Sequence, residues 1–176
     1  MVNLEDKNPR KPDGWTPLHF AAQSGHLKTC EFIMDKIHNK NPGDPEGWTP
    51  FHSAAFNGHL EVCQLFMDTL VNKNPTKRDG GTPFHLAAQG GHIKICELFM
   101  KFLQNKNPAK DDGWTVLHSA AENGHLEICK ILTENTQEIM PETIAGKTPA
   151  IVALEKYHYK VSMMLIQLHM ESMNIE

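Results

Sequence analysis

The sequence repeats with a period of 33 residues, and this period constrains the fold more than any other feature. A spacing of 33 residues separates each cysteine from the next: Cys30, Cys63, Cys96 and Cys129. Glycine, threonine and histidine positions keep the same spacing, with no residue inserted or deleted across five copies. A fixed period of this length is typical of stacked structural units, so we expect an elongated array in which each copy contacts its neighbours.

Each copy contains the signals for two short helices. The first begins at a pair such as Thr16-Pro17, because threonine can cap free helix N–H groups and proline suits the first helical position. The pair Ser24-Gly25 then limits this helix to about two turns. A second, amphipathic helix follows and is predicted to end at an Asn-Pro pair: Asn41-Pro42, Asn74-Pro75 and Asn107-Pro108. Such short pairs cannot bury an apolar face alone, so they must stack.

The repeated residues resemble a known family. Residues 14–27 are Gly-Trp-Thr-Pro-Leu-His-Phe-Ala-Ala-Gln-Ser-Gly-His-Leu, and residues 47–60, 80–93 and 113–126 follow the same pattern. This pattern closely resembles the ankyrin repeat and recurs along nearly the whole chain. The resemblance implies an all-α ankyrin-repeat solenoid, in which antiparallel helix pairs stack and hairpin-like loops project at right angles.

On this basis the chain is one ankyrin-repeat domain over residues 1–176. Four full repeats are expected at residues 11–43, 44–76, 77–109 and 110–142 (repeats 1 to 4), followed by a degraded C-terminal capping repeat at 143–176 (repeat 5). Residues 1–10 align with the end of a repeat and are interpreted as its remnant, which favours a fragment of a longer array over an abbreviated N-terminal cap.

Repeat 5 departs from the repeated pattern. Ile151 replaces the histidine, Tyr157 replaces a glycine and Ser162 replaces the cysteine. Its polar residues are expected to face water at the end of the stack, as a cap requires. They are Lys156, Lys160 and Gln167.

Two features of repeats 1 to 3 differ from the family pattern. Large apolar residues replace the glycine that the family usually carries after the second helix, and they predict a longer second helix with extra apolar contacts. They are Ile37, Leu70 and Leu103. A proline follows each loop asparagine at a position that is hydroxylated in some family members: Asn41, Asn74 and Asn107.

The repeated threonines and histidines are assigned a structural role. Eleven histidines and four cysteines raise the question of a metal site, but no four of them have finger-like spacing. The resemblance implies that each buried imidazole bridges the backbone of adjacent loops. The residues are Thr16 and His19, Thr49 and His52, Thr82 and His85, and Thr115 and His118. We expect no bound metal or cofactor.

No catalytic motif is present. The sequence lacks a Gly-rich phosphate loop, a G-x-S-x-G elbow and an H-E-x-x-H pair. Acidic residues Asp79, Asp111 and Asp112 lie among the basic loop residues, which argues against nucleic-acid binding. The start of the chain lacks the features of a secretory signal, and no apolar run is long enough for a membrane span. We therefore expect a non-enzymatic, monomeric protein of the cytoplasm, or of the nucleus, without membrane insertion.

A protein partner is expected on the concave surface formed by the loops and the first helices, the surface that the family usually uses. A tryptophan precedes the capping threonine in repeats 1, 2 and 4, while Gly81 interrupts this row in repeat 3. Residues at the end of the first helix vary, although their neighbours stay constant. The candidate partner-binding residues are Trp15, Gln23, Trp48, Phe56, Asn57, Gln89, Trp114, Glu122 and Asn123. An alternative role for the tryptophans is to pack on neighbouring loops and stiffen the array.

Two functions of different class fit these features. The chain is expected to act as an adaptor that binds a separate protein. The alternative is a regulatory or targeting segment of a larger enzyme or channel.

Overall fold

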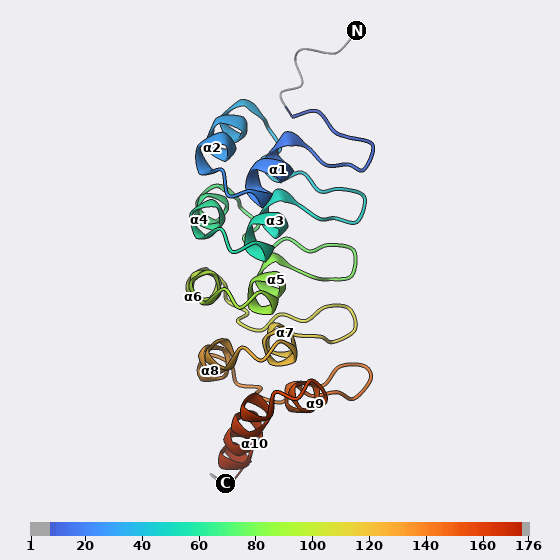
Figure 1. Cartoon of the computed structure of the whole chain (residues 1–176), viewed down its shortest axis with the longest axis vertical. Coiled ribbons are helices and arrows are strands. Elements are labelled where there is room, and N and C mark those ends of the chain that lie inside the picture. Colours follow the sequence, from blue (N-terminus) through green and yellow to red (C-terminus); the bar gives the residue numbers. More distant parts are fainter. Residues whose placement is uncertain (1–7, 174–176) are drawn as a thin grey trace.

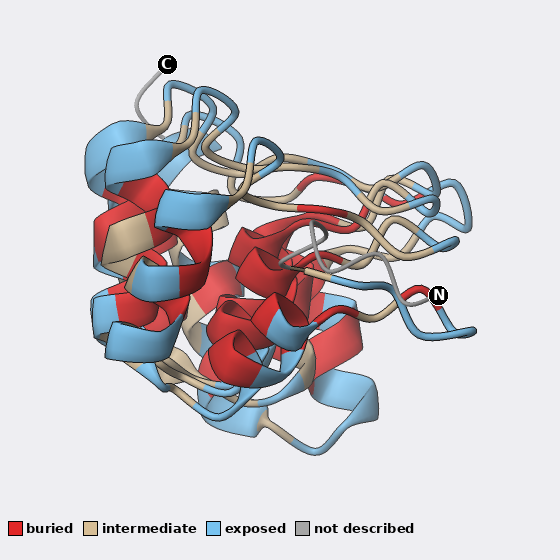
Figure 2. Ribbon diagram, turned by 90° about the horizontal axis from the view of Figure 1, so that it is seen from above, coloured by how far each residue is buried: buried red, intermediate tan, exposed pale blue. Residues whose placement is uncertain are grey.

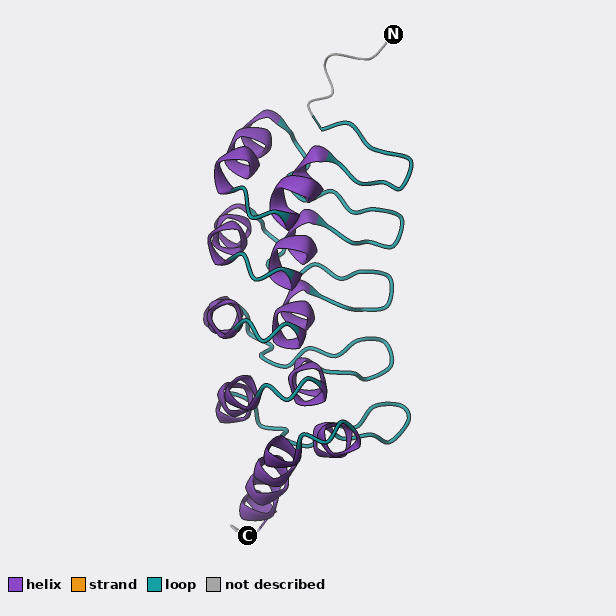
Figure 3. Ribbon diagram, viewed as in Figure 1, coloured by secondary structure: helices purple, strands orange, loops and turns teal. Residues whose placement is uncertain are grey.

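The computed structural model describes residues 8–173, and helices are its regular elements, as predicted (Figures 1 and 3). Within this range the only ladder pairing is an isolated bridge between Ala109 and Thr115. The helices are α1 (Pro17–Gln23), α2 (Leu27–Lys36), α3 (Pro50–Phe56), α4 (Leu60–Thr69), α5 (Pro83–Gln89), α6 (Ile93–Phe102), α7 (Val116–Glu122), α8 (Leu126–Glu134), α9 (Pro149–Glu155) and α10 (Tyr159–Met173).

The helices form two parallel rows. Odd-numbered first helices lie in one row, even-numbered second helices lie in the other, and the loops project from the side of the first helices (Figure 1). Most buried residues lie in and between the two rows, whereas the loop tips are exposed (Figure 2). The predicted all-α solenoid of stacked helix pairs is confirmed.

The first helices begin and end where the sequence predicts. In repeats 2 to 5 the hydroxyl of the preceding threonine accepts a hydrogen bond from the backbone N–H three residues later, as Thr49 does from His52 at 3.4 Å. Four of the five first helices also have proline in the first turn. Each contains seven residues, which is about two turns of α-helix.

The prediction of longer second helices is wrong. Helices α2, α4 and α6 end five residues before the Asn-Pro pairs, at Lys36, Thr69 and Phe102. The next residue in each case has an extended backbone and ends the helix: Ile37, Leu70 and Leu103. These side chains are partly buried and pack against the core, so the predicted extra apolar contact is present without a longer helix.

Lysine side chains account for the early helix ends. A helix that stops leaves carbonyl groups of its last turn without backbone partners. In repeats 1 to 3 a lysine ammonium donates to one of them: Lys40 to Met34, Lys73 to Met67 and Lys106 to Met100. These carbonyl groups therefore have partners although the helix does not continue.

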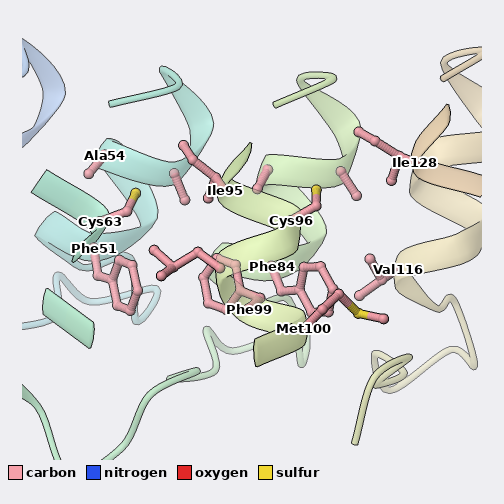
Figure 4. Close-up of a cluster of buried hydrophobic side chains, with 14 of the residues drawn as sticks. Phe51, Ala54, Cys63, Phe84, Ile95, Cys96, Phe99, Met100, Val116 and Ile128 are labelled. Carbon is pink, nitrogen blue, oxygen red and sulfur yellow. The ribbon is translucent and has the colours of Figure 1, made fainter. Parts of the chain in front are cut away.

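The core contains a row of phenylalanine rings that crosses repeat boundaries (Figure 4). Phe51 stacks on Phe99 at 5.5 Å between ring centroids, and Phe99 stacks on Phe84 at 5.0 Å. The four repeated cysteines are unpaired and buried. Burial raises the pKa of the Cys30 thiol to about 11 and that of Cys129 to about 12, so these thiols stay protonated at neutral pH.

Backbone hydrogen bonds connect successive loops along the stack. Arg78 N–H donates to Glu46 O at 2.9 Å, and Asp111 N–H donates to Asp79 O at 3.2 Å. Ile144 N–H donates to Asp112 O at 2.8 Å. Repeat 2 has proline at the donor position, Pro45, which has no N–H group to donate.

The two ends of the stack bear on the predicted remnant and on the predicted cap. Residues 1–7 of the proposed remnant, and residues 174–176, lie outside the described residues. Asn8, inside that remnant, accepts a hydrogen bond from Leu18 N–H at 3.1 Å. At the other end, Lys156, Lys160 and Gln167 are exposed, but so are large apolar residues of α9 and α10. The predicted exposure of the three polar residues is confirmed, and the end surface carries apolar residues beside them.

Candidate protein-binding surface

Each repeated histidine of the first helices connects two repeats. In repeat 2, Thr49 Oγ1 lies 2.8 Å from His52 Nδ1, and the other ring nitrogen, Nε2, lies 3.3 Å from Gly81 O in the next loop. A carbonyl oxygen can only accept, so Nε2 carries the proton, whereas Nδ1 accepts from the backbone N–H of Thr49 at 3.2 Å and carries no proton. The imidazole is therefore neutral.

The same geometry recurs in the other full repeats. His19 Nε2 lies 3.1 Å from Trp48 O, His85 Nε2 lies 3.1 Å from Trp114 O, and His118 Nε2 lies 2.9 Å from Lys147 O. All four histidines are buried. Burial disfavours the charged form and lowers the pKa of His52 and His85 to about 4. Burial also lowers the pKa of His19 and His118.

A second set of histidines connects repeats in the opposite direction. The Nε2 atom of each donates to a carbonyl at the end of the preceding repeat's first helix: His59 to Gln23 at 2.8 Å, His92 to Phe56 at 3.0 Å, and His125 to Gln89 at 2.9 Å. The sequence analysis missed this role, although the repeated Gly-His pairs signal it. The glycine makes room for the ring, because a Cβ atom at Gly91 would lie 2.6 Å from His125.

The loop asparagines hold the start of the first helices. Their Oδ1 atom accepts from a backbone N–H ten residues later: Asn41 from Phe51 at 3.0 Å, Asn74 from Phe84 at 3.3 Å and Asn107 from Leu117 at 2.9 Å. The first N–H groups of a helix have no partner within the helix, so these side chains supply the missing hydrogen-bond acceptors. Sequence analysis missed this role as well, although the 33-residue spacing of the asparagines signals it.

The variable candidate residues occupy equivalent places on the stack. The last residues of α1, α3, α5 and α7 are Gln23, Phe56, Gln89 and Glu122. The first three are exposed, whereas Glu122 is half-buried, with its carboxylate 3.5 Å from the Lys156 ammonium.

The two candidate asparagines have a structural contact of their own. Asn57 and Asn123 are exposed and follow α3 and α7, and their side-chain amides donate to the carbonyls of Ser53 and Ser119 at 2.8 and 2.9 Å. Because these carbonyls belong to the last turn of each first helix, the two amides cap the helix ends.

The tryptophans are half-buried and contact their own repeats. Trp48 packs against His52, with centroids 5.7 Å apart, and its indole N–H donates to Ser53 Oγ at 2.8 Å. In repeat 4, the Trp114 indole donates to Ser119 Oγ at 3.1 Å. These contacts hold the rings in place within one repeat.

Two aromatic pairs lie side by side on repeats 1 and 2. Trp48 meets Phe56 edge-on at 6.1 Å, and Trp15 lies 5.1 Å from Phe20, which sequence analysis did not select. Phe56 is 44% exposed. In repeat 3 the equivalent of Phe20, Leu86, is buried. The exposed aromatic residues of this surface are therefore concentrated on repeats 1 and 2.

The loops carry paired charges. Arg78 forms an ion pair with Glu46 at 2.9 Å, and Lys77 pairs with Asp79 at 2.6 Å. A cavity of about 490 Å³ lies between repeats 3 and 4, lined by residues that include Asn105, and none of the candidate partner-binding residues lines it. Within residues 8–173, no three His, Cys, Asp or Glu side chains are grouped as a metal site requires. No helix in the described part of the chain is long and apolar enough to cross a membrane.

Comparison with known proteins agrees with the architecture. A family model described as ankyrin repeats, in three copies, matches residues 1–79 and again residues 66–143. No curated protein matches the chain. Members of the matching family are generally protein–protein interaction modules and typically have no catalytic activity. With two matches that together extend over residues 1–143, and five stacked helix pairs, the chain belongs to the ankyrin repeat family.

Proposed function

We propose that the chain is an adaptor that binds a protein partner on the loop and first-helix surface, with repeat 2 at the centre of the contact. The observation that carries this proposal is the presence of two partly exposed aromatic pairs on adjacent repeats, Trp15 with Phe20 and Trp48 with Phe56. Aromatic residues of this kind carry much of the binding energy at protein interfaces.

The Trp48 ring is also held in a fixed position before a partner binds. The Trp48 indole is fixed by Ser53 and by contact with His52, so little side-chain entropy remains to be lost when a partner binds. Exposed polar residues at equivalent places on neighbouring repeats, Gln23 and Gln89, border the aromatic pair of repeat 2. Apolar anchors with a polar rim are the usual composition of such an interface.

Gly81 does not provide open space for a partner group. The glycine is buried, and a Cβ atom there would lie 2.8 Å from Lys77 Cε. The lysine side chain therefore occupies the place where the neighbouring repeats have an indole. We expect the aromatic contact to end at repeat 3, and to be flanked on the far side by Trp114 and the polar residues Glu122 and Asn123.

We propose that binding takes place in the cytoplasm or the nucleus, because four buried, unpaired thiols suit a reducing compartment. The paired loop charges favour a protein over a nucleic acid as the partner, since neutralised lysine and arginine side chains release few counterions.

The experiment starts with capture of partners from a native extract on the complete chain. The affinity of each direct partner is then measured for Phe56→Ala and for Phe32→Ala, a matched control that removes a 68% exposed ring from α2 in the other row of helices. We expect Phe56→Ala to weaken binding by about 2 kcal/mol, with an unchanged melting temperature, and Phe32→Ala to leave both unchanged. Equal affinity for wild type and Phe56→Ala, or an equal loss in both variants, would rule out this surface.

A further inference from the structure

Helix α10 carries a stripe of exposed apolar residues along one side. The stripe consists of Tyr159, Met163, Ile166, Met170 and Met173, which are between 44% and 71% exposed. Their spacing alternates between four and three residues. Other residues of the same helix are buried and contact the core instead: Val161, Ser162 and Leu165.

Two members of the stripe distinguish the last repeat, whereas Tyr159 and Ile166 occupy positions that are partly or fully buried in repeat 4, at Leu126 and Thr133. In repeat 4 the residues equivalent to Met163 and Met170 are Lys130 and Gln137, and both are exposed and polar. Helix α10 has 15 residues, whereas α2, α4 and α6 have 10. Stacking of one repeat on another requires neither the methionines nor the additional helical turns, because the earlier repeats stack without them.

The spacing identifies the kind of partner. An apolar repeat of 3.5 residues on one side of a helix is the pattern that packs against a second helix in a coiled coil. Methionine side chains are flexible and adapt to such a surface. Figure 1 shows α10 running away from the stack, toward the end of the molecule, so its last turns extend beyond repeat 4.

We propose that the stripe pairs with the same stripe of a second copy of this chain, with the two α10 helices antiparallel. The two-fold axis would pass through Ile166, so that Tyr159 of one copy lies opposite Met173 of the other. Met163 would then lie close to Met170 of the second copy. This assignment differs from the monomer expected from the sequence.

Charge complementarity favours the antiparallel order. Lys160 and Glu171 flank the stripe near its two ends, and both are exposed. Antiparallel pairing places Lys160 of each copy beside Glu171 of the other, so two opposite-charge contacts form. In a parallel pair the two residues would be separated by about 16 Å along the helix axes, at a rise of about 1.5 Å per residue. These contacts therefore favour the antiparallel order.

The first test is the mass of the complete chain in solution. Sedimentation equilibrium over the micromolar range should show a monomer of 19.8 kDa converting to a species of twice that mass as concentration rises. Met163→Glu combined with Ile166→Glu should abolish the larger species with the helical circular dichroism retained. Val71→Glu, which alters a fully exposed apolar residue elsewhere, should leave the larger species unchanged.

Cross-linking tests the direction. A mixture of Met163→Cys and Met170→Cys chains should form a disulfide-linked dimer faster than either variant alone, because the antiparallel order brings these two positions together and the native cysteines are buried. Self-linking of Met163→Cys at the higher rate would contradict antiparallel pairing. A monomer at every concentration, or a dimer that survives the double glutamate substitution, would overturn the proposal.

Discussion

Repeats 1 to 4 and repeat 5 share one architecture but differ in the residues that reach toward a neighbour. The histidines of the first helices donate forward to the next loop, and repeat 5, which has no following loop in the described residues, carries Ile151 instead. The glycines before the second helices leave space for a histidine of the next repeat, and repeat 5 carries Tyr157 there, with a φ of 63°.

Residues that act within a repeat are retained in repeat 5. Thr148 still caps its own helix, accepting from Ile151 N–H at 3.3 Å. His158 keeps the place of the histidines that face the preceding repeat, where a Cβ atom at Gly124 would lie 2.5 Å from its ring. The comparison shows that a repeat's sequence depends on which neighbours it has, as well as on its own helices.

The largest expected effect concerns the forward histidines, which repeat 5 lacks. In the unfolded chain an imidazole takes up its proton near pH 6.5, whereas His52 and His85 in the fold do so only near pH 4. The contribution of these neutral histidines to the free energy of unfolding is therefore complete above pH 6.5. It is lost as pH falls toward 4, at about 3 kcal/mol for each histidine. Denaturant unfolding across this range should show the loss.

The acid effect has a matched control. His52→Gln combined with His85→Gln should flatten the pH dependence between 6.5 and 4, because carboxylates titrate equally in both proteins. An unchanged slope in the double variant would contradict the assignment to these histidines.

Removal of repeat 5 should have the next largest effect. A chain that stops after residue 142 loses the buried side chains Val152, Val161 and Leu165 and exposes the surface of repeat 4 on which they pack. We expect a loss of about 5 kcal/mol in the free energy of unfolding, or aggregation. If calorimetry shows the shortened chain melting at the same temperature as the complete one, repeat 5 does not stabilise the array.

Two glycine-to-alanine substitutions separate the steric effect of the next repeat's histidine from the cost of a positive φ angle. Gly91 and Gly146 both have positive φ, at 75° and 71°, so alanine costs about 1 kcal/mol at either site. Only Gly91→Ala also places a Cβ atom against the histidine of the next repeat, which adds about 2 kcal/mol. Thermal melts of the two variants measure the difference, and equal losses would show that the neighbour is not the cause.

The smallest effect concerns the loop asparagines, which repeat 5 replaces with Met140. Asn74→Ala removes the acceptor for Phe84 N–H and should destabilise the fold by about 1 kcal/mol. Asn74→Asp keeps an acceptor at a helix N-terminus and should retain most of the stability. Equal losses in both variants, measured by urea unfolding, would mean that the hydrogen bond contributes little.

Much of this fold could be predicted from the sequence because its main determinants are local. Threonine, proline and glycine set the starts and ends of the first helices within a few residues of themselves, and the 33-residue period implies stacking. The ends of the second helices could not be predicted, because they depend on Lys73 and its equivalents folding back onto carbonyl groups six residues earlier.

The candidate surface was predicted only in part. Trp48 and Phe56 stand out as aromatic residues at variable positions, but Phe20 joins them through a contact that only the fold shows. The stripe on α10 was missed because the sequence was compared with the repeat pattern, in which a second helix is shorter. The partner itself depends on the surface of another molecule, which this sequence does not contain.

The loop-to-loop hydrogen bonds have a mechanical consequence. They run along the stack and act in series, so a force pulling on its two ends passes through every junction and opens the weakest one first. Pro45 leaves the junction of repeats 1 and 2 without the backbone bond that links the later loops, and Arg10, just before repeat 1, donates to the last carbonyl of repeat 1, Gly43 O, at 2.7 Å. Under tension repeat 1 should therefore separate and unfold first, and the other repeats should then unfold one at a time.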